Sequence, residues 1–237
     1  KVTVLEAVDR VMARVTSPVV SEFYADAHRG AGVDLRLGAR LAGFEGQDGH
    51  VQQAVLEGGE AVDADLVVIG VGVLPNQELA ADAGLKADNG IWVDEFAATE
   101  DPDIYAIGDC TNHPSALYGR RLRLESVHNA LEQAKTAAQS ICGAPAPYDQ
   151  APWFWSDQYD LKLQTVGLSQ GYDEFVVRGH PAARKFAVFY LKEGALIAVD
   201  AVNAPAEFLG AKKLVAAKMR PDKDQLTDPA IPLKSLA

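Results

Sequence analysis

The stretch Lys1-Val2-Thr3-Val4-Leu5-Glu6 decides how the first part of this chain folds. Its apolar residues predict a β-strand, Val2–Leu5, which ends on an acidic residue and is followed by a polar turn. Ser17-Pro18 then predicts the start of a helix, because proline favours the first helical position. Val33–Leu37 alternates apolar and polar residues as a second strand does. This order of strand, helix and strand is typical of an α/β fold.

Glu6 stands where a dinucleotide-binding Rossmann unit places its acidic residue. In that unit the fingerprint G-x-G-x-x-G opens the first helix, and an acid about 20 residues later holds the ribose hydroxyls. The chain has neither this fingerprint nor an initiator Met, so we interpret it as the C-terminal portion of a larger protein. A carboxylate at this position repels a 2′-phosphate and therefore favours NADH over NADPH. A solvated glutamate at a strand end is the alternative interpretation.

Composition excludes several classes of protein. Hydrophobic residues make up 48% of the 237 residues and charged residues 23%, which is ordinary for a globular protein. The net charge of -11 argues against nucleic acid as a partner, and no apolar run approaches the length of about 18 residues that a membrane span needs. Cys110 and Cys142 have no spacing typical of metal ligands, so we predict a reduced, cytoplasmic setting and no metal site.

The region that follows the second strand predicts a small meander and then a buried strand. Glycines separate the three short strands of the meander, which are Arg40–Glu45, Val51–Leu56 and Glu60–Val62. Asp65–Gly70 is a continuous apolar run, typical of a buried parallel strand. Gly70 and Gly72 would let a ligand approach the backbone where this strand ends. An ordinary tight turn is the alternative.

Further along, Ile104–Ile107 predicts a short buried strand that ends at Gly108-Asp109. Glu125–Gly143 predicts a helix that Gly143 ends, and the helical spacing places four residues on one face: Ala130, Ala134, Ala137 and Ile141.

Pro145 and Pro147 predict a linker, and four antiparallel strands should follow it: Leu161–Leu168, Glu174–Arg178, Phe186–Leu191 and Ala195–Ala201. Glu193-Gly194 predicts a hairpin turn, and a helix is expected from about Ala204 to Met219.

These patterns predict an α/β protein with three domains. Residues 1–98 form a partial Rossmann-like NAD domain, truncated at its N-terminus, and residues 99–147 form part of an FAD domain. Residues 148–237 form an α+β domain with an antiparallel sheet. The assignment of the first two domains to these cofactors depends on the resemblance described next.

The segment Thr99–Asp109 (TEDPDIYAIGD) resembles the second flavin-binding motif of the FAD-dependent pyridine nucleotide oxidoreductases. The resemblance implies that Asp109, beside Gly108, accepts hydrogen bonds from the ribityl chain of FAD. Leu124–Ala134 resembles the segment of that family whose helix N-terminus, here Ser126 and Val127, faces the flavin pyrimidine. A helix N-terminus can stabilise negative charge on such a ring.

The stretch Pro152–Tyr159, followed by Gln164–Leu168, resembles the C-terminal domain of ferredoxin and rubredoxin reductases of oxygenase systems, of the putidaredoxin reductase type. The resemblance places Trp155 beside the flavin ring. It implies an enzyme that transfers hydride from NADH to FAD and then single electrons to a [2Fe–2S] ferredoxin, with no catalytic acid or base. His180-Pro181 lacks the surroundings of the catalytic dyad of disulfide reductases, and the remaining histidines are expected on the surface or in loops.

A basic stretch lies near the C-terminus of this acidic chain. Lys212 and Lys213 begin it, and Lys135 of the flavin-side helix joins them as a candidate docking surface for an acidic iron–sulfur protein. A solvated helix face is the alternative. We expect the parent protein to be a monomer or a weak homodimer.

Two other functions remain open. In the first, the enzyme passes its electrons to a rubredoxin, to dioxygen or to a fused domain. In the second, the chain is a non-catalytic fragment that binds no FAD, and we expect the isolated fragment to be inactive. The missing first strand then predicts an exposed apolar sheet edge.

Overall fold

The computed structural model describes residues 1–236 of the chain. The chain divides into two compact units, Lys1–Gly72 and Val73–Ala237. The three predicted domain boundaries stay predictions. None of the described helices is long and apolar enough to cross a membrane.

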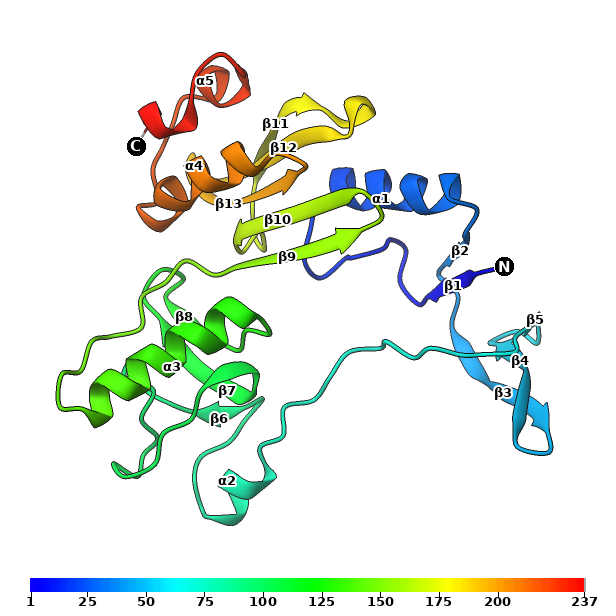
Figure 1. Cartoon of the computed structure of the whole chain (residues 1–237), viewed down its shortest axis with the longest axis horizontal. Helices are drawn as coiled ribbons and strands as arrows, with labels where there is room; N and C mark the ends of the chain where they lie inside the picture. The colour runs from blue at the N-terminus through cyan, green and yellow to red at the C-terminus, as the bar shows by residue number, and fades with distance from the viewer. Residues whose placement is uncertain (237) are drawn as a thin grey trace. The chain divides into compact units, whose positions relative to one another are not determined.

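The first unit begins with the predicted strand, helix and strand. β1 (Thr3–Glu6) pairs in parallel with β2 (Asp34–Leu37), and α1 (Pro18–Gly30) connects them (Figure 1). Ser17 is the N-cap of α1, as predicted, and the helix buries Val20, Tyr24 and Ala25. The register places Glu6 opposite Leu37 at the end of the strand pair.

The predicted meander is also confirmed. β3 (Leu41–Gln47), β4 (His50–Leu56) and β5 (Ala61–Asp63) form an antiparallel sheet in this order.

The prediction of a buried strand at Asp65–Gly70 is wrong. This segment has no regular secondary structure, and Leu66 and Val68 are 78% and 86% exposed (cyan coil in Figure 1). A strand needs a neighbour that pairs with its backbone and covers its side chains. No strand among the described residues pairs with this segment. Apolar surface is therefore exposed here, as expected for an unpaired region.

The second unit begins with short elements. These are α2 (Glu78–Asp82), β6 (Ile91–Trp92), the 3₁₀ turn η1 (Gly108–Cys110), β7 (Thr111–Ser115) and β8 (Arg120–Leu122). β7 pairs in parallel with β6 and antiparallel with β8.

The predicted strand Ile104–Ile107 is not formed. An isolated antiparallel β-bridge between Ala98 and Tyr105 is the only β-pairing that the structure describes for this segment, and Ile107 is 41% exposed. The backbone N and the Oγ1 of Thr99 lie 2.9 and 3.0 Å from the carbonyl oxygen of Ile104. These contacts close a tight loop, which leaves too few residues for a strand.

The predicted long helix is confirmed as α3 (Val127–Ile141), with Gly143 at a φ of 77° just beyond its end. The face that carries Ala130, Ala134, Ala137 and Ile141 is not the buried one, because Ile141 is 67% exposed and only Ala137 of the four is buried. The helix instead buries three polar side chains beside Ala137, namely Asn129, Gln133 and Thr136. Polar contacts with the rest of the unit therefore decide the orientation of α3.

The last part of the chain forms a five-stranded antiparallel sheet in the order β11-β12-β13-β10-β9 (Figure 1). Four of its strands match the predictions: β10 (Leu161–Gly167), β11 (Glu174–His180), β12 (Lys185–Lys192) and β13 (Ala195–Val202). β9 (Trp153–Gln158) was not predicted, because its Trp-Phe-Trp run shows no alternation of apolar and polar residues. The predicted turn at Glu193-Gly194 is confirmed, with a positive φ at both residues.

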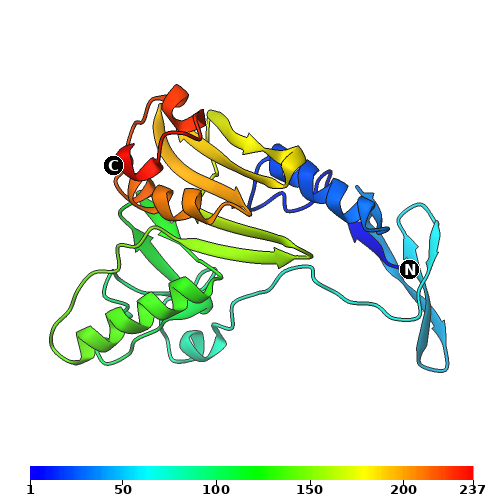
Figure 2. The same ribbon diagram turned by 45° about the horizontal axis from the view of Figure 1, so that its top comes forward.

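α4 (Pro205–Ala216) packs against β10 and β13 and covers one face of this sheet (orange in Figure 2). Phe208, Leu214 and Val215 of the helix belong to the hydrophobic core that it shares with the sheet. Gly167 lies under this helix with a φ of 79°, and a Cβ there would lie 2.2 Å from the carbonyl oxygen of Ile197. Only glycine fits this position.

The C-terminal elements, α5 (Lys223–Thr227) and the 3₁₀ turn η3 (Leu233–Leu236), are held by the buried Arg178 of β11. Its guanidinium donates to the carbonyl oxygens of Leu226 at 3.2 Å and Ile231 at 2.7 Å. Its Nε lies 3.4 Å from Glu207 Oε1. The remaining short 3₁₀ turn, η2 (Pro181–Ala183), follows β11.

We expect Arg178→Met to lower the free energy of unfolding by about 2–4 kcal/mol, because it leaves buried carbonyl oxygens without donors. Arg184→Met is the matched control, since Arg184 forms a solvent-exposed ion pair with Asp160 and should contribute less than about 1 kcal/mol. Urea unfolding of both variants measures the difference. Equal losses would show that Arg178 does not hold the C-terminal segment.

Candidate functional site

The turn that carries Gly108 and Asp109 is fixed against α3 by a buried glutamine. Gly108 has a φ of 83°, a conformation that favours glycine, and its N–H donates to Gln133 Oε1 at 2.7 Å. Thr111 Oγ1 lies 2.9 Å from the same oxygen. Gln133 is 1% exposed, so its side-chain oxygen is a fixed acceptor in the interior of the unit.

The carboxylate of Asp109 is exposed, and no described residue donates a hydrogen bond to it. Its backbone oxygen lies 3.4 Å from Nη1 of Arg123, which also pairs with Glu125 Oε1 at 2.7 Å. Arg123 thereby links the turn to the segment just before α3. The carboxylate remains available for hydroxyl donors.

The N-terminus of α3 is only partly capped. Ser126 Oγ accepts from the N–H of Asn129 at 3.1 Å. Among the described residues, the N–H groups of Val127 and His128 have no acceptor. Val127 and Leu131 lie one turn apart and are 56% and 57% exposed. The helix therefore offers free backbone donors and its positive dipole end beside an exposed apolar face.

A row of rings extends from the first turn of α3 to β9. The His128 ring lies 5.2 Å from that of Trp153, which lies 5.7 Å from that of Trp155. Trp155 is 44% exposed and ends the row. Burial lowers the pKa of His128; Glu132 opposes this effect, and Lys212 and Lys135 add to it. At neutral pH the ring is therefore uncharged.

Two histidines are not where the sequence predicted them. His128 is half-buried in a helix, and His113 of β7 is only 2% exposed, with its ring 5.0 Å from that of Tyr148. Both histidine rings pack against aromatic rings. The spacing of the histidines in the sequence does not reveal this packing.

The residues predicted to bind the nicotinamide nucleotide lie in the first unit. Glu6 ends β1, and its Oε1 accepts from the N–H of Val8 at 3.1 Å. Gly70 and Gly72 are exposed, and a Cβ at either position would meet nothing within 4 Å. Contacts within the described chain therefore do not require glycine's small size at these two positions, although Gly72 has a φ of 104°.

The predicted docking lysines are only partly brought together. Lys135 pairs with Glu132, and Lys212 Nζ lies 4.8 Å from the ring centroid of Trp153. Both act on the pKa of His128, so they lie near the same ring. Lys213 is exposed, and the structure describes no such contact for it.

The structure thus places Gly108, Asp109, Ser126, Val127 and Trp155 around the N-terminal half of α3. η1 contacts this helix through Gln133, and β9 contacts it through the His128–Trp153 pair. The sequence did not predict the roles of Gln133, Arg123 and Trp153. The spacing of the polar residues Asn129, Gln133 and Thr136 is the signal that could have indicated a polar buried face.

We expect Gln133→Leu to destabilise the protein by about 1–3 kcal/mol, because the N–H of Gly108 loses its buried acceptor. Hydrogen exchange should show loss of protection at that amide. Gln139→Leu is the control on the same helix, where the side chain is exposed and the change should stay within about 0.5 kcal/mol. Unchanged protection of Gly108 in Gln133→Leu would contradict this account of the turn.

Two family models match the chain. Residues 1–134 match the pyridine nucleotide-disulphide oxidoreductase model, and residues 153–237 match the reductase C-terminal model. The ferredoxin reductase subunit of 5,5′-dehydrodivanillate O-demethylase from Sphingobium sp. is 47% identical, over 100% of this chain and 58% of that protein. Putidaredoxin reductase of Pseudomonas putida is 48% identical, over 99% of this chain and 56% of that protein.

A solved structure of the covalent putidaredoxin reductase–putidaredoxin complex superimposes with a TM-score of 0.94 at 47% identity. It covers 99% of this chain and 57% of that chain. The chain thus spans somewhat more than half the length of the relatives that it matches. Its motifs, its fold and the family models agree, and they imply FAD and a nicotinamide nucleotide as cofactors. The chain belongs to the pyridine nucleotide-disulphide oxidoreductase family and carries the reductase C-terminal domain.

Proposed function

We propose that this chain is part of an NADH-dependent, FAD-containing reductase that passes electrons to a [2Fe–2S] ferredoxin. One observation carries the proposal: the exposed carboxylate of Asp109, the free N–H groups of α3 and the half-exposed Trp155 all border the N-terminal half of one helix. These groups match the polar chain, the electron-accepting ring and the flat apolar face of a flavin.

The described residues fit FAD in three respects. Asp109 would accept hydrogen bonds from the ribityl hydroxyls, because its carboxylate has no donor among the described residues. The N–H of Val127 would donate to the ring, and Ser126 holds the helix end in place. Trp155 would cover the ring and exclude water. Bound FAD would accept a hydride from the nicotinamide and release electrons singly.

Glu6 supports NADH as the electron donor. One of its carboxylate oxygens accepts from the backbone of Val8, which fixes the side chain at the end of β1. A carboxylate held there accepts ribose hydroxyls and repels a 2′-phosphate.

Lys135 and Lys212 support an acidic electron acceptor. They lie beside the row of rings that ends at Trp155, so an acidic iron–sulfur protein attracted to them would stand close to the proposed flavin. Charges of this kind mainly raise the rate of association.

The test uses the full-length protein with either nucleotide as donor and with ferredoxin or rubredoxin as acceptor. We expect NADH to be preferred, ferredoxin to be reduced faster than rubredoxin, and the ferredoxin rate to fall as salt rises. Glu6→Ala should lower the preference for NADH by about tenfold. Glu22→Ala, an exposed glutamate on α1, should leave the preference unchanged.

Faster reduction of rubredoxin would favour the alternative acceptor. A protein without visible flavin absorbance would favour a non-catalytic role. An unchanged nucleotide preference in Glu6→Ala would remove Glu6 from the nucleotide site.

A further inference from the structure

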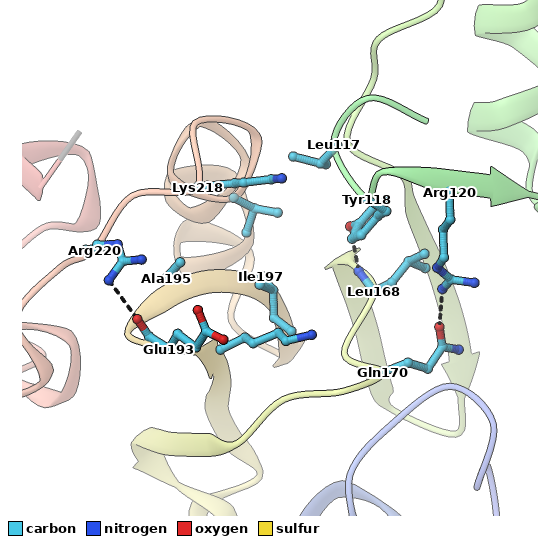
Figure 3. A pocket seen from close by; sticks show the side chains of 12 residues that line it. Leu117, Tyr118, Arg120, Leu168, Gln170, Glu193, Ala195, Ile197, Lys218 and Arg220 are labelled. Carbon is cyan, nitrogen blue, oxygen red and sulfur yellow. Dashed lines mark hydrogen bonds between the residues drawn. The ribbon is translucent and has the colours of Figure 1, made fainter. Parts of the chain in front are cut away.

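A pocket of about 400 Å³ lies within the second unit (Figure 3), and none of the residues assigned to FAD lines it. One side is formed by Tyr118 of the loop between β7 and β8 and by Arg120, the first residue of β8. The other side is formed by the sheet and the end of α4, where Leu168, Ile197 and Val215 provide an apolar floor. This volume lies in the range of small-molecule sites, about 300–1,000 Å³.

Four basic side chains line this pocket, against the single acid Glu193: Arg120, Lys192, Lys218 and Arg220. None of them forms an ion pair with a described residue. Arg120 donates to the amide oxygen of Gln170 at 3.2 Å, and Arg220 donates to the backbone oxygen of Glu193 at 2.8 Å. Both partners are neutral, so Glu193 is the only opposing charge among the lining residues and a net positive charge remains. An excess of like charge at one pocket of a chain with a net charge of -11 attracts an anion.

The walls of the pocket are fixed without a ligand. Tyr118 Oη accepts from the N–H of Leu168 at 2.9 Å, which ties the loop to the sheet. Burial raises the pKa of Tyr118 to about 12, so the hydroxyl keeps its proton at neutral pH and can donate to an anion. Across the pocket, Arg220 holds the turn at Glu193-Gly194, and the N–H of Glu193 donates to Asp173 Oδ2 at 2.7 Å.

We propose that this pocket binds a small aromatic carboxylate, with its ring against the apolar side chains and its carboxylate toward the basic side chains that line the pocket. An inorganic anion would leave the floor uncovered, and a neutral aromatic molecule would leave the charges uncompensated. The pocket is lined by none of the residues proposed to bind FAD or NADH, so the inference does not depend on the proposed function.

The experiment titrates the full-length protein with benzoate in a calorimeter at low salt. We expect saturable binding that weakens as the salt concentration rises. Benzyl alcohol and inorganic phosphate should each bind at least about tenfold more weakly than benzoate. Benzyl alcohol lacks the negative charge, and phosphate lacks the apolar ring.

Lys192→Gln combined with Lys218→Gln should weaken benzoate binding by about tenfold or more. The matched control combines Lys185→Gln with Lys162→Gln. Lys185 is exposed at the opposite end of β12 from Lys192, and Lys162 is exposed on β10. The control should bind within about twofold of the unmodified chain.

Ala195→Leu provides a second variant that narrows the pocket and keeps all four charges, and it should also weaken benzoate binding by about tenfold or more. Circular dichroism checks that each variant folds. The proposal is overturned if benzoate does not saturate, if phosphate binds as well as benzoate, or if the control weakens binding as much as the pocket variant.

Discussion

The hydrogen bond from the N–H of Gly108 to Gln133 Oε1 is the contact on which the candidate site depends. It is buried, and one glutamine oxygen serves both the turn and Thr111. A glycine with positive φ can aim its N–H at this oxygen, and the next residue, Asp109, then emerges into solvent. The position of the Asp109 carboxylate thus follows from a polar contact in the interior of the unit.

α3 connects this buried contact to the exposed surface of the candidate site. Its buried polar face receives η1, its first turn holds His128 against Trp153, and its exposed face carries Val127 and Leu131. Donor groups and an apolar patch therefore lie on one helix, and the half-exposed indole of Trp155 lies on the neighbouring β9, as a large planar cofactor requires. The basic pocket lies elsewhere in the same unit and is built on the C-terminal sheet, which Arg178 and α4 stabilise.

The sequence predicted elements with a strong local pattern, such as α1, the meander, α3 and four strands of the C-terminal sheet. It predicted the site residues only through resemblance to a family. The two strands that were predicted and are not formed are Asp65–Gly70 and Ile104–Ile107, where strand formation depends on a partner strand that no local pattern reveals. The roles of Gln133 and of the basic pocket were not predictable either, because each joins residues that are far apart in the chain.

The central claim is that the carboxylate of Asp109 holds FAD. The most direct measurement is the FAD content of full-length protein with Asp109→Ala, from its flavin absorbance, beside Asp103→Ala. Asp103 is also exposed and lies in the loop that precedes η1, so it controls for the loss of one negative charge. The account predicts that Asp109→Ala binds FAD at least about tenfold more weakly than the unmodified protein and is purified with less FAD, while Asp103→Ala retains its FAD. Equal FAD content in the two variants would contradict it.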